Sequence, residues 1–159
     1  MPEPGDKAPL FELPDDAGKP LALAKLKGHV AVLYFYPKDD TSGCTAETKD
    51  FSNLSGEFAK AGIAVVGISP DSAASHAKFK AKYDLTVSLA ADEDKTVAQA
   101  YGVWVEKSMY GRRYMGVERT TFLIDAKGKV VQVWRKVKVP GHAEAVLDAA
   151  LKLASGQKP

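Results

Sequence analysis

The sequence predicts an α/β fold in which helices flank a parallel β-sheet. Residues 30–36 and 63–69 are apolar, rich in β-branched and aromatic side chains, and show no polar alternation, as expected of strands covered on both faces. A helical pattern follows each of these runs. The order strand, helix, strand, helix indicates parallel strands joined by right-handed crossovers.

The first predicted helix covers residues 43–61. Phe51, Leu54 and Phe58 form one apolar stripe along it, and Gly62 stands where a glycine commonly ends a helix. The strand before this helix ends at a proline, because proline cannot donate to a β-ladder.

The rest of the chain continues the alternation. We expect a second helix over residues 72–82, a short strand and a short helix around residues 97–101, two strands joined by a turn over residues 119–134, and an amphipathic helix over residues 142–154. The acidic stretch at residues 92–95 is interpreted as a helix N-terminal cap. Residues 155–159 are expected to form a frayed tail.

Length and composition indicate one domain, residues 1–159. The 22 basic and 20 acidic residues give a net charge of +2 without long blocks of either sign, which argues against nucleic acid or a membrane surface as a partner. The N-terminal stretch lacks the basic start and apolar core of a signal peptide, so we expect a cytoplasmic protein. The single cysteine excludes an internal disulfide, which suits a reducing compartment.

That cysteine, Cys44, follows Gly43 in a polar turn between a predicted strand and a predicted helix. Open α/β sheets place their ligands at this C-terminal edge of the strands. Thr41 or Ser42 can cap the helix, which leaves the N–H groups of its first turn and their partial positive charge aimed at the sulfur. Phe51 follows Cys44 by nearly two helical turns, so we expect the sulfur to face inward.

A recessed thiolate needs a nearby cation, because burial disfavours its charge. The candidates are Arg112, Arg113 and Arg119. Arg119 opens an apolar strand, where a charge has no packing role, whereas the other two arginines lie in the polar stretch YGRRYMG, which is typical of a solvated turn. Arg119 is therefore favoured, with Arg112 and Arg113 as alternatives.

Other chemistries fit the sequence poorly. His29, His76 and His142 are scattered beside loops or helix starts without metal-ligand spacing toward Cys44, and we interpret them as exposed or capping residues. Glycine motifs for nucleotides are missing, and the paired acids at residues 39–40 are interpreted as turn residues. We therefore expect neither a cofactor nor a metal.

The residues around the cysteine resemble a known family. PKDDTSGC, residues 37–44, fits the P-x-x-x-T-x-x-C pattern of the peroxiredoxins, and YPKDDTSGCTAE is similar to the bacterioferritin comigratory protein or Q-type branch. The likeness continues through YGVWVEKSMYGRRYMGVERTTFLID and covers nearly the whole chain. It implies a thioredoxin fold with a central mixed β-sheet flanked by helices. It also implies a thiol-dependent peroxidase, an antioxidant oxidoreductase of cell redox homeostasis with a redox-active cysteine.

The resemblance gives each residue of the motif a role. Cys44 would be the peroxidatic nucleophile, which attacks hydrogen peroxide or an organic hydroperoxide and becomes a sulfenic acid. Thr41 would contact the sulfur and the peroxide through its hydroxyl, and Pro37 would shield the site. Arg119 would stabilise the thiolate and orient the peroxide.

Two further residues are expected to help in binding the substrate, together with Cys44, Thr41 and Arg119. The N–H group near Gly43 would support the negative charge that forms on the departing oxygen. Glu47 matches an acid of the family that could orient an arginine, although a helix-capping role fits it comparably well.

The chain departs from the branch at the resolving cysteine. Many members carry it five residues after the peroxidatic cysteine, where this chain has Lys49, and others carry it on the following helix, at a position that aligns with Lys80. The oxidised Cys44 should therefore need an external thiol, such as thioredoxin, glutaredoxin or glutathione. Ser42 replaces the proline of the branch's TPGC and removes no catalytic group.

Two alternative functions share parts of this pattern. A dithiol oxidoreductase would need Cys-x-x-Cys, and the first of those positions here is Thr41, which excludes it. A peroxide sensor or redox-signalling protein that forms mixed disulfides through Cys44 fits the missing resolving cysteine and remains the alternative.

The aromatic residues leave the oligomeric state open, and we expect a monomer or a weak homodimer. Trp104, Tyr110 and Tyr114 could line the site, an interface or the core. Met109, Tyr110 and Met115 would favour a less polar peroxide if they form the rim of the site.

Overall fold

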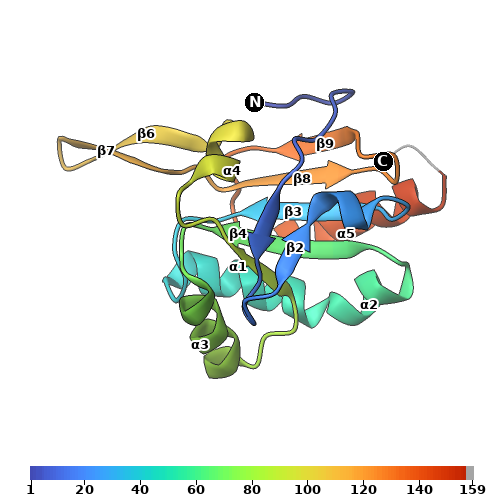
Figure 1. Ribbon diagram of the computed structural model, residues 1–159, viewed down its shortest axis with the longest axis horizontal. Coiled ribbons are helices and arrows are strands. Elements are labelled where there is room, and N and C mark those ends of the chain that lie inside the picture. The colour runs from blue at the N-terminus through green and yellow to red at the C-terminus, as the bar shows by residue number, and fades with distance from the viewer. Residues whose placement is uncertain (157–159) are drawn as a thin grey trace.

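The chain folds around a five-stranded mixed sheet, seen in a computed structural model that describes residues 1–156 (Figure 1). Its strands, in the spatial order β5-β4-β3-β8-β9, are β3 (Ala31–Phe35), β4 (Ala64–Ser69), β5 (Ser88–Ala91), β8 (Thr120–Ile124) and β9 (Val130–Trp134). β3, β4 and β5 are parallel, whereas β8 and β9 run antiparallel to their neighbours. The parallel sheet inferred from the alternation is therefore confirmed for three strands only, and the mixed sheet that the resemblance implies is the one present.

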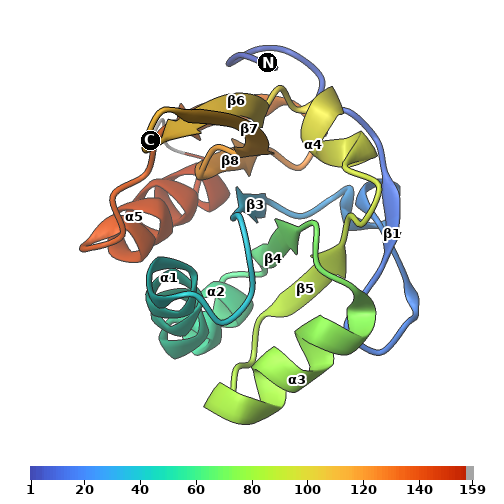
Figure 2. The ribbon, with the colours of Figure 1, turned by 90° about the vertical axis from the view of Figure 1, so that its left-hand side faces the viewer.

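Helices cover the sheet on both faces (Figure 2). α1 (Ser42–Asn53), α2 (Ser55–Lys60) and α5 (His142–Ala154) lie on one side, α4 (Thr96–Ala100) lies on the other, and α3 (Ala73–Tyr83) lies beside the β5 edge. Among residues 1–156, no helix combines the length and the apolar character that crossing a bilayer requires.

The single helix predicted over residues 43–61 is wrong in one respect, because it breaks at Leu54 into α1 and α2. Thr86 accounts for the break: its hydroxyl donates to the Ser52 carbonyl, and its backbone N–H donates to the Ser52 hydroxyl. These bonds compete with the helical pairing of Ser52. Gly62 follows the end of α2 with φ of 72°, as the sequence predicts.

Two helix starts follow their sequence signals. Asp92 accepts hydrogen bonds from the N–H groups of Val97 and Ala98 at 3.2 and 2.8 Å, so the predicted acidic cap of α4 is confirmed. Ser72 caps α3 by accepting from the N–H group of Ser75 at 3.1 Å.

β3 separates two apolar clusters. Its side chains alternate between the layer that holds α1 and α5 and the layer that holds α4, and they are Val32 and Tyr34 on the first side and Ala31, Leu33 and Phe35 on the second. The Tyr34 ring stacks on Phe51 of α1 with centroids 4.6 Å apart. Gly67 makes this possible, because an added Cβ there would lie 2.5 Å from the Tyr34 ring. The Tyr34 side chain of β3 therefore packs against α1 and holds this helix on the sheet.

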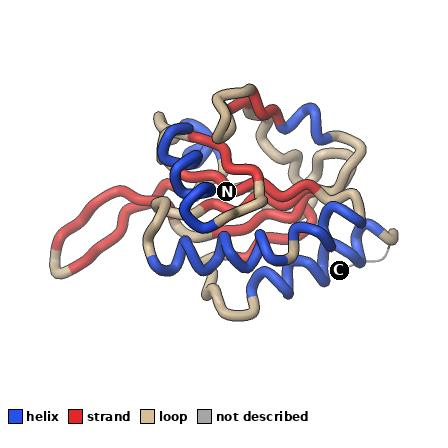
Figure 3. The backbone as a smooth tube through the Cα atoms, turned by 90° about the horizontal axis from the view of Figure 1, so that it is seen from below, coloured by secondary structure: helices blue, strands red, loops and turns tan. Residues whose placement is uncertain are grey.

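Two hairpins were not predicted from the sequence. β1 (Glu12–Pro14) and β2 (Pro20–Ala22) pair near the N-terminus, and β6 (Trp104–Met109) pairs with β7 (Arg112–Val117) in a ribbon that projects from the body (Figures 1 and 3). Tyr110, at the tip of this ribbon, is 99% exposed. In the single chain, the Tyr110 side chain therefore neither packs in the core nor lines a buried site.

The C-terminal tail differs in part from the expectation. Residues 157–159 of the predicted tail lie outside the described residues. Ser155 and Gly156 donate their N–H groups to the carbonyls of Leu151 and Leu153, so these two residues continue the hydrogen bonding at the end of α5.

Candidate active site

The register of the sheet brings Arg119 to the turn that carries Cys44. β3 and β8 are antiparallel, with Phe35 opposite Thr120. The end of β3, from which the chain enters α1, therefore lies beside the beginning of β8, which Arg119 immediately precedes. Residues that are 75 positions apart in the sequence meet at this edge of the sheet.

Cys44 and Glu47 are buried, and both contact the partly buried Arg119. The Arg119 guanidinium donates from Nη2 to the Cys44 Sγ at 3.3 Å and from Nη1 to the Glu47 Oε1 at 2.7 Å. Cys44 is 1% exposed, which agrees with the inward-facing sulfur expected from its helical phase. Glu47 lies one helical turn after Cys44 and on the same face of α1. One guanidinium therefore contacts the sulfur and the carboxylate together.

Burial sets the electrostatics of this group. It raises the pKa of Glu47 to about 7, against the lowering effect of the Arg119 charge. Burial by itself would lower the pKa of Arg119, but the charges of Glu47 and Cys44 outweigh it and raise that pKa further. Arg119 therefore stays cationic at any physiological pH. The Glu47 Oε2 is buried without a hydrogen-bond partner among the described residues.

The other motif residues surround the first turn of α1. An added Cβ at Gly43 would lie 3.2 Å from the Arg119 Nη2, so glycine permits the close approach of the guanidinium. Pro37 is half-buried in the loop between β3 and α1. Thr41 occupies the N-cap position, but its hydroxyl donates to the Lys38 carbonyl at 2.8 Å and neither caps the helix nor bonds to the sulfur. The expected capping bond is therefore not formed by Thr41, and its expected contact with the sulfur stays a prediction.

The arginines that the sequence left as alternatives lie elsewhere. Arg112 and Arg113 begin β7 in the projecting hairpin, and both are exposed. Arg113 lies 3.5 Å from Glu106 of the facing strand. They belong to a strand, not to the solvated turn that the sequence suggested, and Arg119 is the arginine in contact with Cys44.

Two further residues come near the site and were not predicted. Burial and the charge of Arg119 lower the pKa of Lys107 on β6, while the charge of Cys44 opposes them. Burial and the charge of Arg119 also lower the pKa of His142 to about 4. No sequence signal marked Lys107, because its nearness to Arg119 depends on where the projecting hairpin leaves the body of the fold.

The expectation that all three histidines are exposed or capping is wrong for two of them. His29 is exposed, but His76 is completely buried and His142 is nearly so. The His142 Nε2 lies 2.8 Å from the Thr121 hydroxyl, and the His76 ring contacts Asp39. Each is held by a polar partner from a distant segment, which a local reading of the sequence does not reveal.

Comparison with known proteins matches this fold and site. Residues 4–133 match the AhpC/TSA family. The chain belongs to the AhpC/TSA family. This peroxiredoxin is 52% identical over 145 residues to the putative peroxiredoxin Bcp of Coxiella burnetii, covering 91% of this chain and 96% of the relative. It is 46% identical over 145 residues to the peroxiredoxin Bcp of Bacillus subtilis, covering 91% and 92%.

Solved structures agree with these relatives. The Xanthomonas campestris bacterioferritin comigratory protein, studied for alkyl peroxide reduction, superposes with a TM-score of 0.86 at 46% identity over 91% of this chain and 92% of its own. A cysteine-to-serine variant of Xylella fastidiosa PrxQ gives a TM-score of 0.88 at 38% identity over 93% and 94%. The peroxiredoxin described here is therefore a thiol-dependent peroxidase with a thioredoxin fold, and its single cysteine fits a one-cysteine mechanism.

Proposed function

We propose that this peroxiredoxin reduces hydrogen peroxide and organic hydroperoxides through Cys44, with Arg119 as the residue that stabilises the reacting charge. The observation that carries this proposal is the 3.3 Å contact between the Arg119 Nη2 and the Cys44 Sγ in the first turn of α1. The guanidinium and the helix N-terminus both favour a negative charge on the sulfur. The alkyl peroxide activity of the Xanthomonas campestris relative supports organic hydroperoxides as substrates.

The oxidation step follows from this geometry. The Cys44 thiolate attacks one peroxide oxygen in line with the O–O bond, so that an S–O bond forms and the O–O bond breaks. The second oxygen departs with the electron pair as hydroxide or alkoxide and then takes up a proton. Arg119 and the N–H groups at Gly43 and Cys44 stabilise that departing charge without having to reorganise. In this proposal Thr41 turns its hydroxyl from the Lys38 carbonyl to the peroxide, and Pro37 shields the site.

Regeneration requires two equivalents of an external thiol. The first thiol attacks the Cys44 sulfenic acid, forms a mixed disulfide and releases water, and the second frees the Cys44 thiol and leaves as a disulfide. The positions where the branch carries a second cysteine are occupied here by lysines, Lys49 and Lys80, and each lysine has a side-chain partner. The Lys49 Nζ lies 4.8 Å from the centre of the Tyr83 ring, and the Lys80 Nζ lies 3.2 Å from the Asp16 Oδ1.

The proposal extends to the partners and the location of the protein. The external thiol is supplied by a thioredoxin, glutaredoxin or glutathione system, and the chain acts as a monomer or a weak homodimer. A cytoplasmic location fits, because a one-cysteine enzyme depends on a reducing environment for every turnover. Steady peroxide consumption with each reducing system in turn, light scattering of the purified protein and cell fractionation test these three points.

The central experiment titrates the purified protein with hydrogen peroxide and with an alkyl hydroperoxide. Free thiol and intact mass are followed, and peroxide consumption is then measured with each reductant; a Cys44→Ser variant is the control. We expect stoichiometric loss of the thiol, a mass gain of one oxygen and sustained turnover with at least one reductant. Oxidation no faster than that of free cysteine would contradict the peroxidase proposal. Fast oxidation without turnover by any reductant would favour the sensor alternative.

A further inference from the structure

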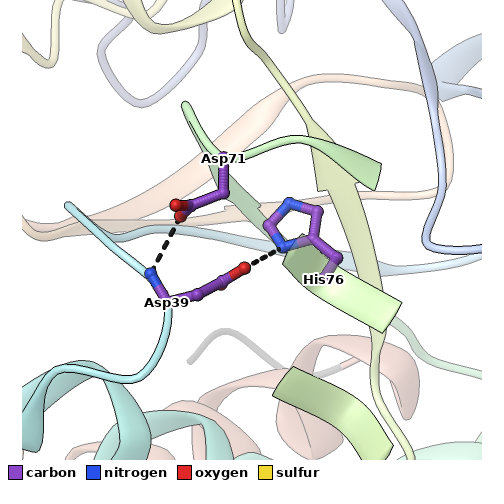
Figure 4. Close-up of side chains that lie close together, drawn as sticks. All are labelled: Asp39, Asp71 and His76. Atoms are coloured by element: carbon purple, nitrogen blue, oxygen red, sulfur yellow. Dashed lines mark hydrogen bonds and ion pairs between the residues drawn. The ribbon is translucent and has the colours of Figure 1, made fainter. Parts of the chain in front are cut away.

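Asp39, in the loop between β3 and α1, is held by contacts that the chemistry of the cysteine does not use. Its carboxylate accepts hydrogen bonds from the hydroxyls of Tyr36 and Ser75 at 2.6 and 2.8 Å and lies 2.8 Å from the His76 Nδ1. Its backbone N–H donates to the Asp71 Oδ2 at 2.8 Å (Figure 4). The main chain and the side chain of this one loop residue are therefore anchored to the residue that follows β3, to α3 and to the segment before α3.

His76 connects this loop to the far edge of the sheet. Its ring is fully buried, and its Nε2 lies 3.0 Å from the Ala90 carbonyl oxygen of β5. A carbonyl only accepts, so the Nε2 carries a hydrogen, and the close approach of the Nδ1 to the Asp39 carboxylate requires another hydrogen between them. The Nδ1 also lies 3.4 Å from the Tyr36 hydroxyl, which itself donates to Asp39. Loss of the shorter contact to Asp39 or of the bond to Ala90 would remove the main partner of a buried ring nitrogen.

A metal ion is a weaker explanation of this cluster. Ligand atoms from Asp39, Asp71 and His76 lie within 4.8 Å of one another, which is close enough for one cation. However, both ring nitrogens of His76 and both carboxylate oxygens of Asp39 already have protein partners. The Asp71 Oδ2 also accepts from the Ser69 hydroxyl at 2.6 Å. The cluster is therefore complete as a hydrogen-bond network.

Asp39 links this network to the active site, because only a short stretch of chain separates it from Cys44. Asp39 lies two residues before Thr41, the N-cap of α1, and Cys44 is the third residue of that helix. Asp40 between them has a φ of +58°, in the left-handed region that aspartate adopts more readily than most residues, so the chain turns sharply between Asp39 and α1. The anchoring of Asp39 therefore determines where the first turn of α1 begins.

We propose that His76 is a positioning residue of the peroxidase, which acts through Asp39 to hold the first turn of α1 so that Cys44 stays in contact with Arg119. The inference rests on the proposed role of Cys44 and extends it to a residue on α3 that does not touch the sulfur. When the tie to Asp39 is lost, the loop shifts and the contact between the Cys44 Sγ and the Arg119 Nη2 lengthens. Because such contacts weaken steeply with distance and angle, S–O bond formation slows while the fold persists.

Two substitutions at the same position separate positioning from general stability. Asparagine places its amide nitrogen near the place of the Nδ1, so His76→Asn keeps a donor to Asp39 and loses the bond to Ala90. Glutamine places its amide nitrogen near the place of the Nε2, so His76→Gln keeps the bond to Ala90 and loses the tie to Asp39. Each variant loses one buried hydrogen bond, and we expect both to unfold at a similarly lowered temperature.

The two variants should differ in the chemistry of Cys44. We expect the second-order rate constant for Cys44 oxidation to fall about 10-fold or more in His76→Gln and to stay within about threefold of the wild type in His76→Asn. Ser75→Ala, which removes one donor to Asp39 from the partly buried Ser75, is a milder variant and should slow oxidation by a smaller factor.

The outcomes distinguish this inference from the proposed function. A fast wild type with equal rates in His76→Gln and His76→Asn would overturn the positioning role alone. If neither histidine variant folds, an unchanged rate in Ser75→Ala would overturn it as well. A wild type that is oxidised no faster than free cysteine would overturn the proposed function and this inference together.

Discussion

Two pairs of buried or partly buried ionisable groups flank the first turn of α1, and they lie at different distances from the sulfur. Arg119 and Glu47 are 2.7 Å apart, and His76 and Asp39 are 2.8 Å apart. The arginine of the first pair touches the Cys44 sulfur, whereas the second pair is connected to α1 only through Asp39 in the loop before the helix. The distance within a pair and its burial therefore do not identify the pair that takes part in the reaction. Contact with the Cys44 sulfur identifies it.

The two pairs also differ in how many of their carboxylate oxygens have hydrogen-bond partners. The carboxylate of Asp39 has a partner on each oxygen, while the Glu47 Oε2 has none within residues 1–156. A fully paired network is suited to holding geometry, because any movement breaks several bonds at once. An unpaired carboxylate oxygen beside a cation is instead suited to a site whose charge changes during reaction.

Removal of Arg119 should have the largest effect. Arg119→Ala takes away the donor to the Cys44 sulfur and the cation that faces the departing oxygen. We expect the rate constant for Cys44 oxidation to fall about 100-fold to 1,000-fold, which is the usual loss for one preorganised donor at a developing charge. Stopped-flow measurement of thiol loss checks this value.

Arg112→Ala is the matched control for that variant. It removes an exposed guanidinium of the projecting hairpin, and we expect its rate constant to stay within about threefold of the wild type. Equal losses in the two variants would show that bulk positive charge, and not contact with the sulfur, drives the reaction.

Comparison with Glu47→Gln should show that the buried Glu47 makes the free energy of unfolding depend on pH. Because the pKa of Glu47 is raised from 4.5 to about 7, the folded protein keeps a proton between these pH values that the unfolded chain has released. Raising the pH through this window therefore destabilises the wild type. Relative to Glu47→Gln, we expect it to lose on the order of 3 kcal/mol of unfolding free energy between pH 4.5 and 7.

His142 changes the free energy of unfolding with pH in the opposite direction. The wild type must therefore be compared with Glu47→Gln. Its pKa is lowered from 6.5 to about 4, so between these values the unfolded chain binds a proton that the folded protein does not. Rising pH therefore stabilises the fold through His142 and masks the effect of Glu47 in the wild type alone. Urea denaturation of both proteins at several pH values isolates the difference, and parallel curves would contradict the prediction.

The smallest effect is expected at Asp40, the exposed neighbour of the second pair. Its carboxylate lies 2.7 Å from the Lys82 Nζ and accepts a hydrogen bond from the Tyr83 hydroxyl, both near the end of α3. Asp40→Asn keeps a side chain that tolerates the positive φ, and we expect less than about a twofold change in Cys44 oxidation. A loss as large as that of His76→Gln would mean that the loop is held by its exposed contacts.

The sequence predicted those parts of the molecule that depend on local spacing. The position of Cys44 after a strand, its inward phase relative to Phe51 and the choice of Arg119 at a strand start all follow from patterns a few residues long. The break at Leu54 was missed, because it depends on bonds between Ser52 and the distant Thr86.

Other misses share that cause. The buried state of His76 depends on Asp39 and Ala90, which lie on segments that only the folded sheet brings together. The projecting hairpin carries few apolar side chains that face a core, so the residues on either side of Tyr110 looked like a solvated turn. Long-range partners, not weak local signals, account for what the sequence could not show.

The intact first turn of α1 has a consequence for the lifetime of the enzyme. Because no second cysteine draws the oxidised sulfur out of its place, the sulfenic acid remains in the same surroundings that activate peroxide. Thiol and a second peroxide molecule then compete for one sulfur, and oxidation to the sulfinic acid ends activity. The number of turnovers that each molecule completes is therefore governed by the ratio of reductant to peroxide and not by elapsed time.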